Sequence, residues 1–112
     1  MTLSMRRIVL FTKDMPGMIA FYRDVLDLSL LKDEPGRKEL DANGCVIALH
    51  NGSSHVGKRP PEIGFWSSDV ASAREALTAR GAKLSKIVSG RALTRCEGKK
   101  PDGNPFSISN GP

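Results

Sequence analysis

The chain has 112 residues and a formal net charge of +5, from 17 Lys and Arg residues against 12 Asp and Glu residues. This length suits one domain with one core, and no apolar run approaches the roughly 20 residues that a membrane span requires. The positive charge favours anionic small molecules, while the scatter of the basic residues disfavours a nucleic-acid surface. Two distant cysteines make neither a disulfide scaffold nor a zinc site, so we expect a cytoplasmic protein with reduced thiols.

The first half of the chain reads as a strand, a helix and three further strands. Residues 6–13 are expected as the first strand, and Asp14 can cap a helix that runs to about Leu26. Further strands are expected at 28–31, 38–41 and 45–50, separated by turn signals at residues 34–36 and 43–44. Residues 51–61 are polar, rich in Pro and Gly, and without periodicity, which predicts a linker.

The same plan returns 55 residues later, where Glu62 takes the place of Arg7 and Asp69 takes the place of Asp14. Asp69 can cap a helix that Gly81 ends, and strands are expected at 62–68, 83–88, 91–96 and 106–109. The turn at residues 101–104 combines Pro, Asp, Gly and Asn. We therefore predict a single α+β domain over residues 1–112, built from two βαβββ modules at about 6–50 and 62–109.

Two segments are similar to motifs of a known superfamily. Residues 20–26 read Ala-Phe-Tyr-Arg-Asp-Val-Leu, and residues 100–104 read Lys-Pro-Asp-Gly-Asn. With the repeated βαβββ plan, they make the chain resemble the vicinal oxygen chelate superfamily of glyoxalases, bleomycin-resistance proteins and extradiol dioxygenases. The resemblance covers about residues 7–109 and implies curled mixed sheets around a shared cleft. It is specific for the fold rather than for one activity, because this fold carries many chemistries.

The resemblance also implies where a catalytic metal would be held in metal-dependent relatives. The four ligand positions of such relatives fall on Arg7, Ala48, Glu62 and Ser107 in this chain. A cation and a methyl group cannot replace a histidine and a glutamate as ligands. We therefore expect no metal and no other cofactor in this cleft. A different ligand set, built from Glu62, His50 and His55, is the less favoured alternative.

Strand parity places several side chains on the face that would line the cleft. Apolar walls are expected from Val9, Phe11, Val46 and Trp66, and polar contacts from Arg7, Glu62, His50 and Ser107. The principal hypothesis is a metal-free glyoxalase/bleomycin-resistance-type protein that binds a small anionic or aromatic molecule. One alternative is a lyase, isomerase or dioxygenase that uses Glu62 as a base and Arg7 as an anion clamp. The other is a dimeric interaction module that has no ligand.

Two further expectations concern association and charge pairing. Exposed sheet edges and the small size predict a homodimer, without nucleic-acid or membrane partners. Arg7 and Glu62 occupy matching positions in the two copies, so the repeat predicts that they form an ion pair at the centre of the cleft. The competing expectation is that both side chains reach solvent independently at the rim.

Overall fold

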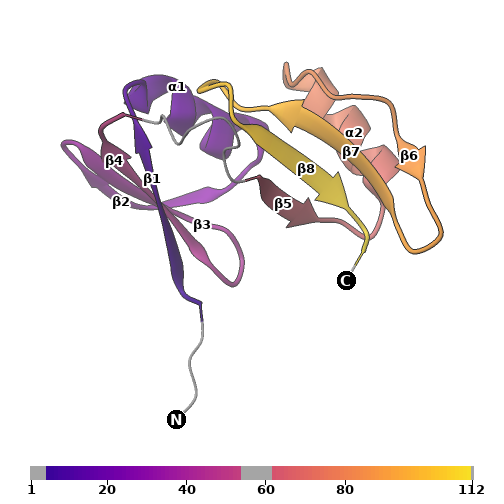
Figure 1. Ribbon diagram of the computed structural model, residues 1–112. Coiled ribbons are helices and arrows are strands. Elements are labelled where there is room, and N and C mark those ends of the chain that lie inside the picture. Colours follow the sequence, from indigo (N-terminus) through magenta and orange to yellow (C-terminus); the bar gives the residue numbers. More distant parts are fainter. Residues whose placement is uncertain (1–4, 54–61, 112) are drawn as a thin grey trace, which may run out of the picture. The chain divides into compact units, whose positions relative to one another are not determined.

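The computed structural model describes residues 5–53 and 62–111, which fall into two units with the break inside residues 54–61. Each unit has one four-stranded mixed sheet and a helical layer (Figure 1). The α+β fold of two βαβββ modules is therefore confirmed. The shared cleft and the single domain over residues 1–112 stay predictions, because the two units are not placed relative to one another. No helix in the described ranges is long and apolar enough to span a membrane.

The first unit contains strands β1 (Arg7–Thr12), β2 (Ser29–Glu34), β3 (Arg37–Asp41) and β4 (Val46–Asn51). Their order across the sheet is β1-β4-β3-β2, with β1 parallel to β4 and the other pairs antiparallel. The parallel pair needs a crossover, and the helical segment between β1 and β2 is part of it. The predicted strands of this half are all present, with ends displaced by a few residues.

The helical layer of the first unit begins where Asp14 caps it. The Asp14 carboxylate accepts a hydrogen bond from Gly17 N at 3.0 Å, and helix α1 (Met15–Ile19) follows. The chain then widens into a π-helix, η1 (Ala20–Val25), which the sequence did not predict. In this segment Phe21 and Tyr22 are both buried, and their rings meet edge to face with centroids 5.2 Å apart. The helical run therefore ends at Val25, close to the expected Leu26.

The second unit repeats this plan with strands β5 (Ile63–Trp66), β6 (Val88–Ser89), β7 (Thr94–Lys99) and β8 (Pro105–Ser109). Helix α2 (Val70–Ala79) is capped by Asp69, which accepts from Ser72 N at 3.0 Å. It lies along the sheet and contacts β7 and β8 (Figure 1). The apolar side chains between helix and sheet are buried: Val70, Leu77, Cys96, Phe106 and Ile108.

The strand predicted at residues 83–88 is wrong for most of its length. It is reduced to an isolated bridge between Leu84 and Gly98 and to the two residues of β6. Arg74 of α2 donates hydrogen bonds to the carbonyl oxygens of Leu84 and Ser85, and the Ser85 hydroxyl accepts from Glu97 N at 2.9 Å. Side chains thus take over partners that a regular ladder would use. The next strand is also displaced, from the predicted 91–96 to Thr94–Lys99.

Candidate functional site

The sheet of the first unit has one face turned away from the buried core. Pairing register places side chains in rows across this face because paired residues point to the same side. One row joins Phe11, His50, Arg37 and Glu34, and the next joins Val9, Ala48, Glu39 and Lys32. The exposed fractions of Val9 and Phe11 are 41% and 49%, so both large apolar side chains are in contact with solvent.

Arg7 is held by a carboxylate of its own sheet. Its Nη2 lies 3.3 Å from the Glu39 carboxylate, although β4 separates the two strands. Ala48 is the partner of Glu39 in the ladder, and its short side chain leaves room for the arginine to cross β4 diagonally. The Arg7 side chain is 49% exposed and that of Glu39 is 15% exposed. The cation is therefore partly neutralised without help from the second unit.

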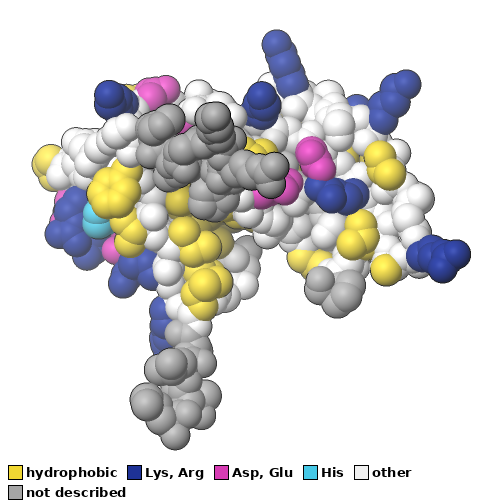
Figure 2. Space-filling model, in the orientation of Figure 1, with side chains coloured by type: hydrophobic (Ala, Val, Ile, Leu, Met, Phe, Trp, Pro, Cys, Tyr) yellow, Lys and Arg dark blue, Asp and Glu magenta, His cyan; other side chains and the backbone are white. Residues whose placement is uncertain are grey.

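Phe11 and His50 form the aromatic part of this face. Their ring centroids are 5.8 Å apart and the planes are perpendicular, an edge-to-face arrangement. Gly52 lies against the Phe11 ring, since a Cβ there would come within 2.9 Å of its Cδ1 atom. One side of the ring is thus packed and the other is open. Figure 2 shows one cyan histidine of this unit beside yellow hydrophobic and dark blue cationic side chains, with acidic groups near them.

The matching face of the second unit carries a charge cluster around Arg95. Glu62 lies just before β5, and its carboxylate is 3.7 Å from Arg95 Nη2. The same guanidinium also contacts the carboxylate of Glu97, its neighbour on β7. All three side chains are between 38% and 52% exposed. Glu62 and Arg7, which the sequence predicted to pair, therefore each have a partner within their own unit.

Trp66 and Ser107 also lie on this outer face of the second unit. Trp66 pairs with Ser109 in the β5–β8 ladder, and Ser107 pairs with Gly64. Trp66 is 68% exposed. Trp66 is equivalent to Phe11 in the repeat. Each is the last residue of the first strand of its unit whose side chain lies on the outer face. Each unit thus presents one large aromatic ring at an equivalent position.

These faces do not fit the metal that some relatives of this fold hold. Arg7 is a cation bound to Glu39, Ala48 has no donor atom, and the Glu62 carboxylate contacts the Arg95 guanidinium. Within residues 5–53 and 62–111 there is no group of three His, Cys, Asp or Glu side chains that could bind a metal ion. His55, proposed as an alternative ligand, lies outside the described residues. This donor set supports no metal-assisted step.

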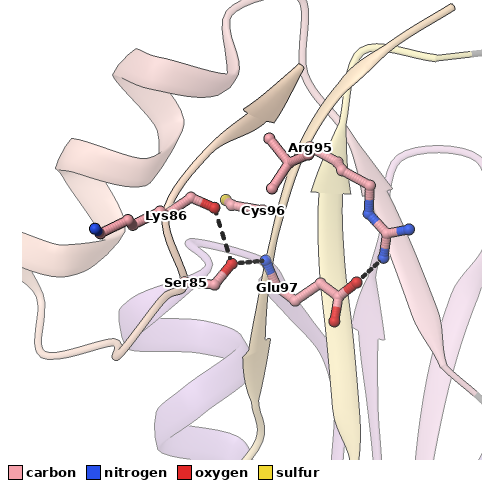
Figure 3. A pocket seen from close by; sticks show the side chains of 6 residues that line it. Ser85, Lys86, Arg95, Cys96 and Glu97 are labelled. Atoms are coloured by element: carbon pink, nitrogen blue, oxygen red, sulfur yellow. Dashed lines mark hydrogen bonds and ion pairs between the residues drawn. The ribbon is translucent and has the colours of Figure 1, made fainter. Parts of the chain in front are cut away.

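A separate pocket of about 400 Å³ lies beside the irregular segment before β6. It is lined by Ser85, Lys86, Val88, Arg95, Cys96 and Glu97. Figure 3 shows Arg95 and Glu97 turned to one another, while the Lys86 side chain points away from them. Burial raises the pKa of the Cys96 thiol, so this thiol is a poor nucleophile. The two charges that face one another in this pocket are therefore paired, and its thiol is not activated.

Two partnerships decide the electrostatics of these faces, and the sequence reading missed both. Glu39 was not among the predicted site residues, and neither its contact with Arg7 nor that of Arg95 with Glu62 was predicted. Arg37, which the register places beside His50, was missed as well. Strand parity within the predicted strand 38–41 could have identified Glu39. Parity within the predicted strand 91–96 likewise turns Arg95 to the face opposite Cys96, but its contact with Glu62 was not predicted.

Comparison with known proteins agrees with this architecture. The family model of the Glyoxalase/Bleomycin resistance protein/Dioxygenase superfamily matches residues 4–108. Among curated proteins, none matches the chain. Similar solved structures include TnmS3, an antibiotic-binding protein from Streptomyces sp. CB03234, with a TM-score of 0.81, 18% identity, and coverage of 100% of this chain and 99% of that chain.

Two other solved structures show how varied these fold relatives are. Lactoylglutathione lyase from Agrobacterium tumefaciens has a TM-score of 0.78 and 17% identity, covering 95% of this chain and 92% of that chain. An integron cassette protein from the mobile metagenome of V. cholerae has a TM-score of 0.74 and 24% identity, covering 97% and 96%. At these identities the likeness establishes the fold alone.

Proposed function

The chain belongs to the Glyoxalase/Bleomycin resistance protein/Dioxygenase superfamily, and from this we propose that it binds a small anionic or aromatic molecule without a metal. The ligand is bound against the outer faces of the sheets, where Val9, Phe11, Val46 and Trp66 supply apolar contact. His50 and Ser107 supply hydrogen bonds. In this proposal Arg7 and Glu62 form ion pairs on these faces and do not contact the ligand directly.

The observation that carries the proposal is the pair of exposed aromatic rings. Phe11 and Trp66 occupy equivalent places in the two modules and are 49% and 68% exposed. Leaving such large apolar surface in water forfeits the free energy that its burial would contribute, about 25 cal/mol per Å². Large exposed apolar groups beside polar side chains are typical of ligand-binding surfaces. The ion pairs beside them reduce the cost of covering this surface with a ligand.

The preference for anions follows from charge. The net charge of +5 attracts anionic solutes, whereas cations are repelled at long range. Cationic drugs of the bleomycin type therefore rank below anionic and neutral aromatic compounds as ligands. Tight binding of such a cation, with no binding of anions, would reverse this ranking.

A ligand screen by thermal shift tests the proposed function. A ligand that binds only the folded state adds RT ln(1 + [L]/Kd), about 2.7 kcal/mol at a concentration of 100 Kd. We expect hits among aromatic and anionic compounds, and loss of binding in Phe11→Ala and Trp66→Ala. Leu31→Ala is a control, because Leu31 is 55% exposed but lies on the edge strand β2 outside the predicted site. If a broad metabolite library gives no hit at all, that result contradicts the proposal.

An enzymatic role is the second candidate. It rests on Glu62, whose side chain is 38% exposed and therefore accessible to a substrate. Arg95 contacts the same carboxylate and competes with that role. If a lyase, isomerase or dioxygenase activity is found, Glu62→Gln should abolish turnover while leaving the affinity for the ligand unchanged. Turnover that persists in Glu62→Gln would exclude Glu62 as the base.

We also propose a homodimer. Members of this family often dimerise, and β2 and β6 are edge strands of their sheets. A homodimer that serves as an interaction module, without a ligand, is the third candidate function. Light scattering at micromolar concentration should give twice the monomer mass of 12.1 kDa. A mass equal to one chain would end the proposal.

A further inference from the structure

The row Phe11, His50, Arg37 on the first unit combines two kinds of recognition group. Phe11 pairs with His50 in the β1–β4 ladder, and His50 pairs with Arg37 in the β4–β3 ladder. Neighbouring strands lie about 4.8 Å apart, so the backbones at Phe11 and Arg37 are roughly 10 Å apart. An open aromatic ring and a guanidinium therefore lie within the length of one small molecule. His50 lies between them and can contact both parts.

Arg37 differs from Arg7, and from Arg95 in the second unit, in its lack of a partner. Arg7 is bound to Glu39, and Arg95 of the second unit contacts two carboxylates. Within the described part of the chain Arg37 makes no ion pair and no side-chain hydrogen bond, and it is exposed. Glu34, its neighbour on β2, lies on the side away from His50. The side facing the aromatic rings is left for an external acceptor.

The backbone at both ends of the row is held in place. Asn51 N donates to the carbonyl oxygen of Gly36 at 3.0 Å, directly before Arg37. Gly36 has φ +74°, a conformation that few other residues adopt, so this turn suits glycine. At the other end Gly52 N donates to Thr12 O at 3.0 Å, and Gly52 packs on the Phe11 ring. The backbone of this row therefore loses little entropy when a ligand binds.

From this juxtaposition we propose that the first unit binds a planar aromatic carboxylate, with the ring on Phe11 and His50 and the carboxylate on Arg37. The inference rests on the proposed small-molecule function and specifies the ligand class and its anchor. Phe11 gives a face or edge for an aromatic ring, an interaction that aliphatic rings lack. A guanidinium matches a carboxylate through two parallel hydrogen bonds, which neither an amide nor an alcohol can reproduce. A ligand with only one of these groups should therefore bind more weakly.

Four probes separate the two contributions. Naphthoate has both the ring and the charge, naphthamide has the ring alone, and cyclohexanecarboxylate has the charge alone. Naphthylmethylamine reverses the charge. By calorimetric titration of the full chain we expect naphthoate to bind at least about tenfold more tightly than each of the other three, equal to about 1.4 kcal/mol.

Variants assign the contributions to residues. Arg37→Gln should weaken naphthoate by about tenfold or more and leave naphthamide within about twofold. Phe11→Leu should weaken both ligands. Arg23→Gln is the matched control for net charge, since Arg23 lies in η1 and pairs with Asp24 at 2.8 Å. Arg37→Glu should reverse the order so that naphthylmethylamine binds better than naphthoate, a gain that misfolding cannot produce.

The possible negative results distinguish a wrong anchor, a wrong ligand class and a wrong function. If Arg37→Gln weakens naphthoate no more than Arg23→Gln does, or if naphthoate and naphthamide bind equally, the anchor is wrong while a small-molecule function survives. If none of the four probes binds but the metabolite screen gives other ligands, the proposed ligand class is wrong. If the metabolite screen also gives none, the proposed function itself fails.

Discussion

The guanidinium of Arg7 on β1 and the carboxylate of Glu39 on β3 lie 3.3 Å apart, with β4 between their strands. The Ala48 side chain is small enough to allow this diagonal contact, and it stands where the sequence resemblance implies a ligand in metal-dependent relatives. A cation and an anion from one sheet thus occupy the area where a metal site would be built. This local pairing bears directly on the predicted Arg7–Glu62 pair, which stays a prediction because the two residues belong to different units.

A pair of double-mutant cycles compares the two possible partners of Arg7. The cycle of Arg7→Met and Glu39→Gln should give a coupling energy of about 0.5–1 kcal/mol, as expected for a half-exposed ion pair. The cycle of Arg7→Met and Glu62→Gln should give a smaller value, since Glu62 contacts Arg95. Urea denaturation measures all the single and double variants. Stronger coupling to Glu62 than to Glu39 would instead support the pair that the repeat predicted.

The buried ion pair of Lys100 and Asp102 is expected to react asymmetrically to substitution. Their charged groups are 3.7 Å apart, and the side chains are 2% and 5% exposed. Asp102→Asn leaves a buried cation without its partner and should lower the free energy of unfolding by about 1–3 kcal/mol. Lys100→Met leaves the Asp102 carboxylate, which still accepts hydrogen bonds from the backbone N and Nδ2 of Asn104, and should therefore cost less. If Lys100→Met destabilises more than Asp102→Asn, the unpaired anion costs more than the unpaired cation and the predicted asymmetry is wrong.

The same lysine predicts a pH dependence. Burial lowers the pKa of Lys100 below its ordinary value of 10.5, and the Asp102 carboxylate opposes that shift. Because the folded pKa is lower than the unfolded one, the charged lysine disfavours folding, and stability should rise as the pH increases through the folded pKa. This rise should be absent from Lys100→Met. Parallel stability curves for the two proteins at alkaline pH would contradict the prediction.

The cap of α2 predicts a second pH dependence, at acid pH. Hydrogen bonds from the backbone and hydroxyl of Ser72 lower the pKa of Asp69 below its ordinary value of 3.8. The stabilisation is therefore complete above 3.8 and is lost as the pH falls through the lower, folded pKa. Asp69→Asn can still cap the helix but does not titrate. The difference in melting temperature between the wild type and Asp69→Asn should shrink on acidification; a constant difference would exclude this linkage.

Much of the fold could be predicted from local sequence signals. Asp14 and Asp69 cap their helices as expected, because a cap needs only a side chain and the backbone three residues further on. The internal repeat of the sequence predicted the two-module architecture. Two local features were not predicted: the π-helix at Ala20–Val25 and the loss of most of the strand at 83–88. At residues 83–88 the side chains of Arg74 and Ser85 make hydrogen bonds in place of those of a β-ladder. The periodicity of the sequence does not reveal such side-chain bonds.

The sequence by itself determined the family, the positions of both helix caps and the outward parity of Val9, Phe11 and Trp66. Only the tertiary structure decided which charges meet, joining Arg7 to Glu39 and Glu62 to Arg95, and leaving Arg37 beside His50. The physical reason is that periodicity and caps depend on residues a few positions apart. A cross-strand ion pair depends instead on the register of strands distant along the chain, such as β1 and β3. A shift of one residue in that register would turn Glu39 to the opposite face of the sheet.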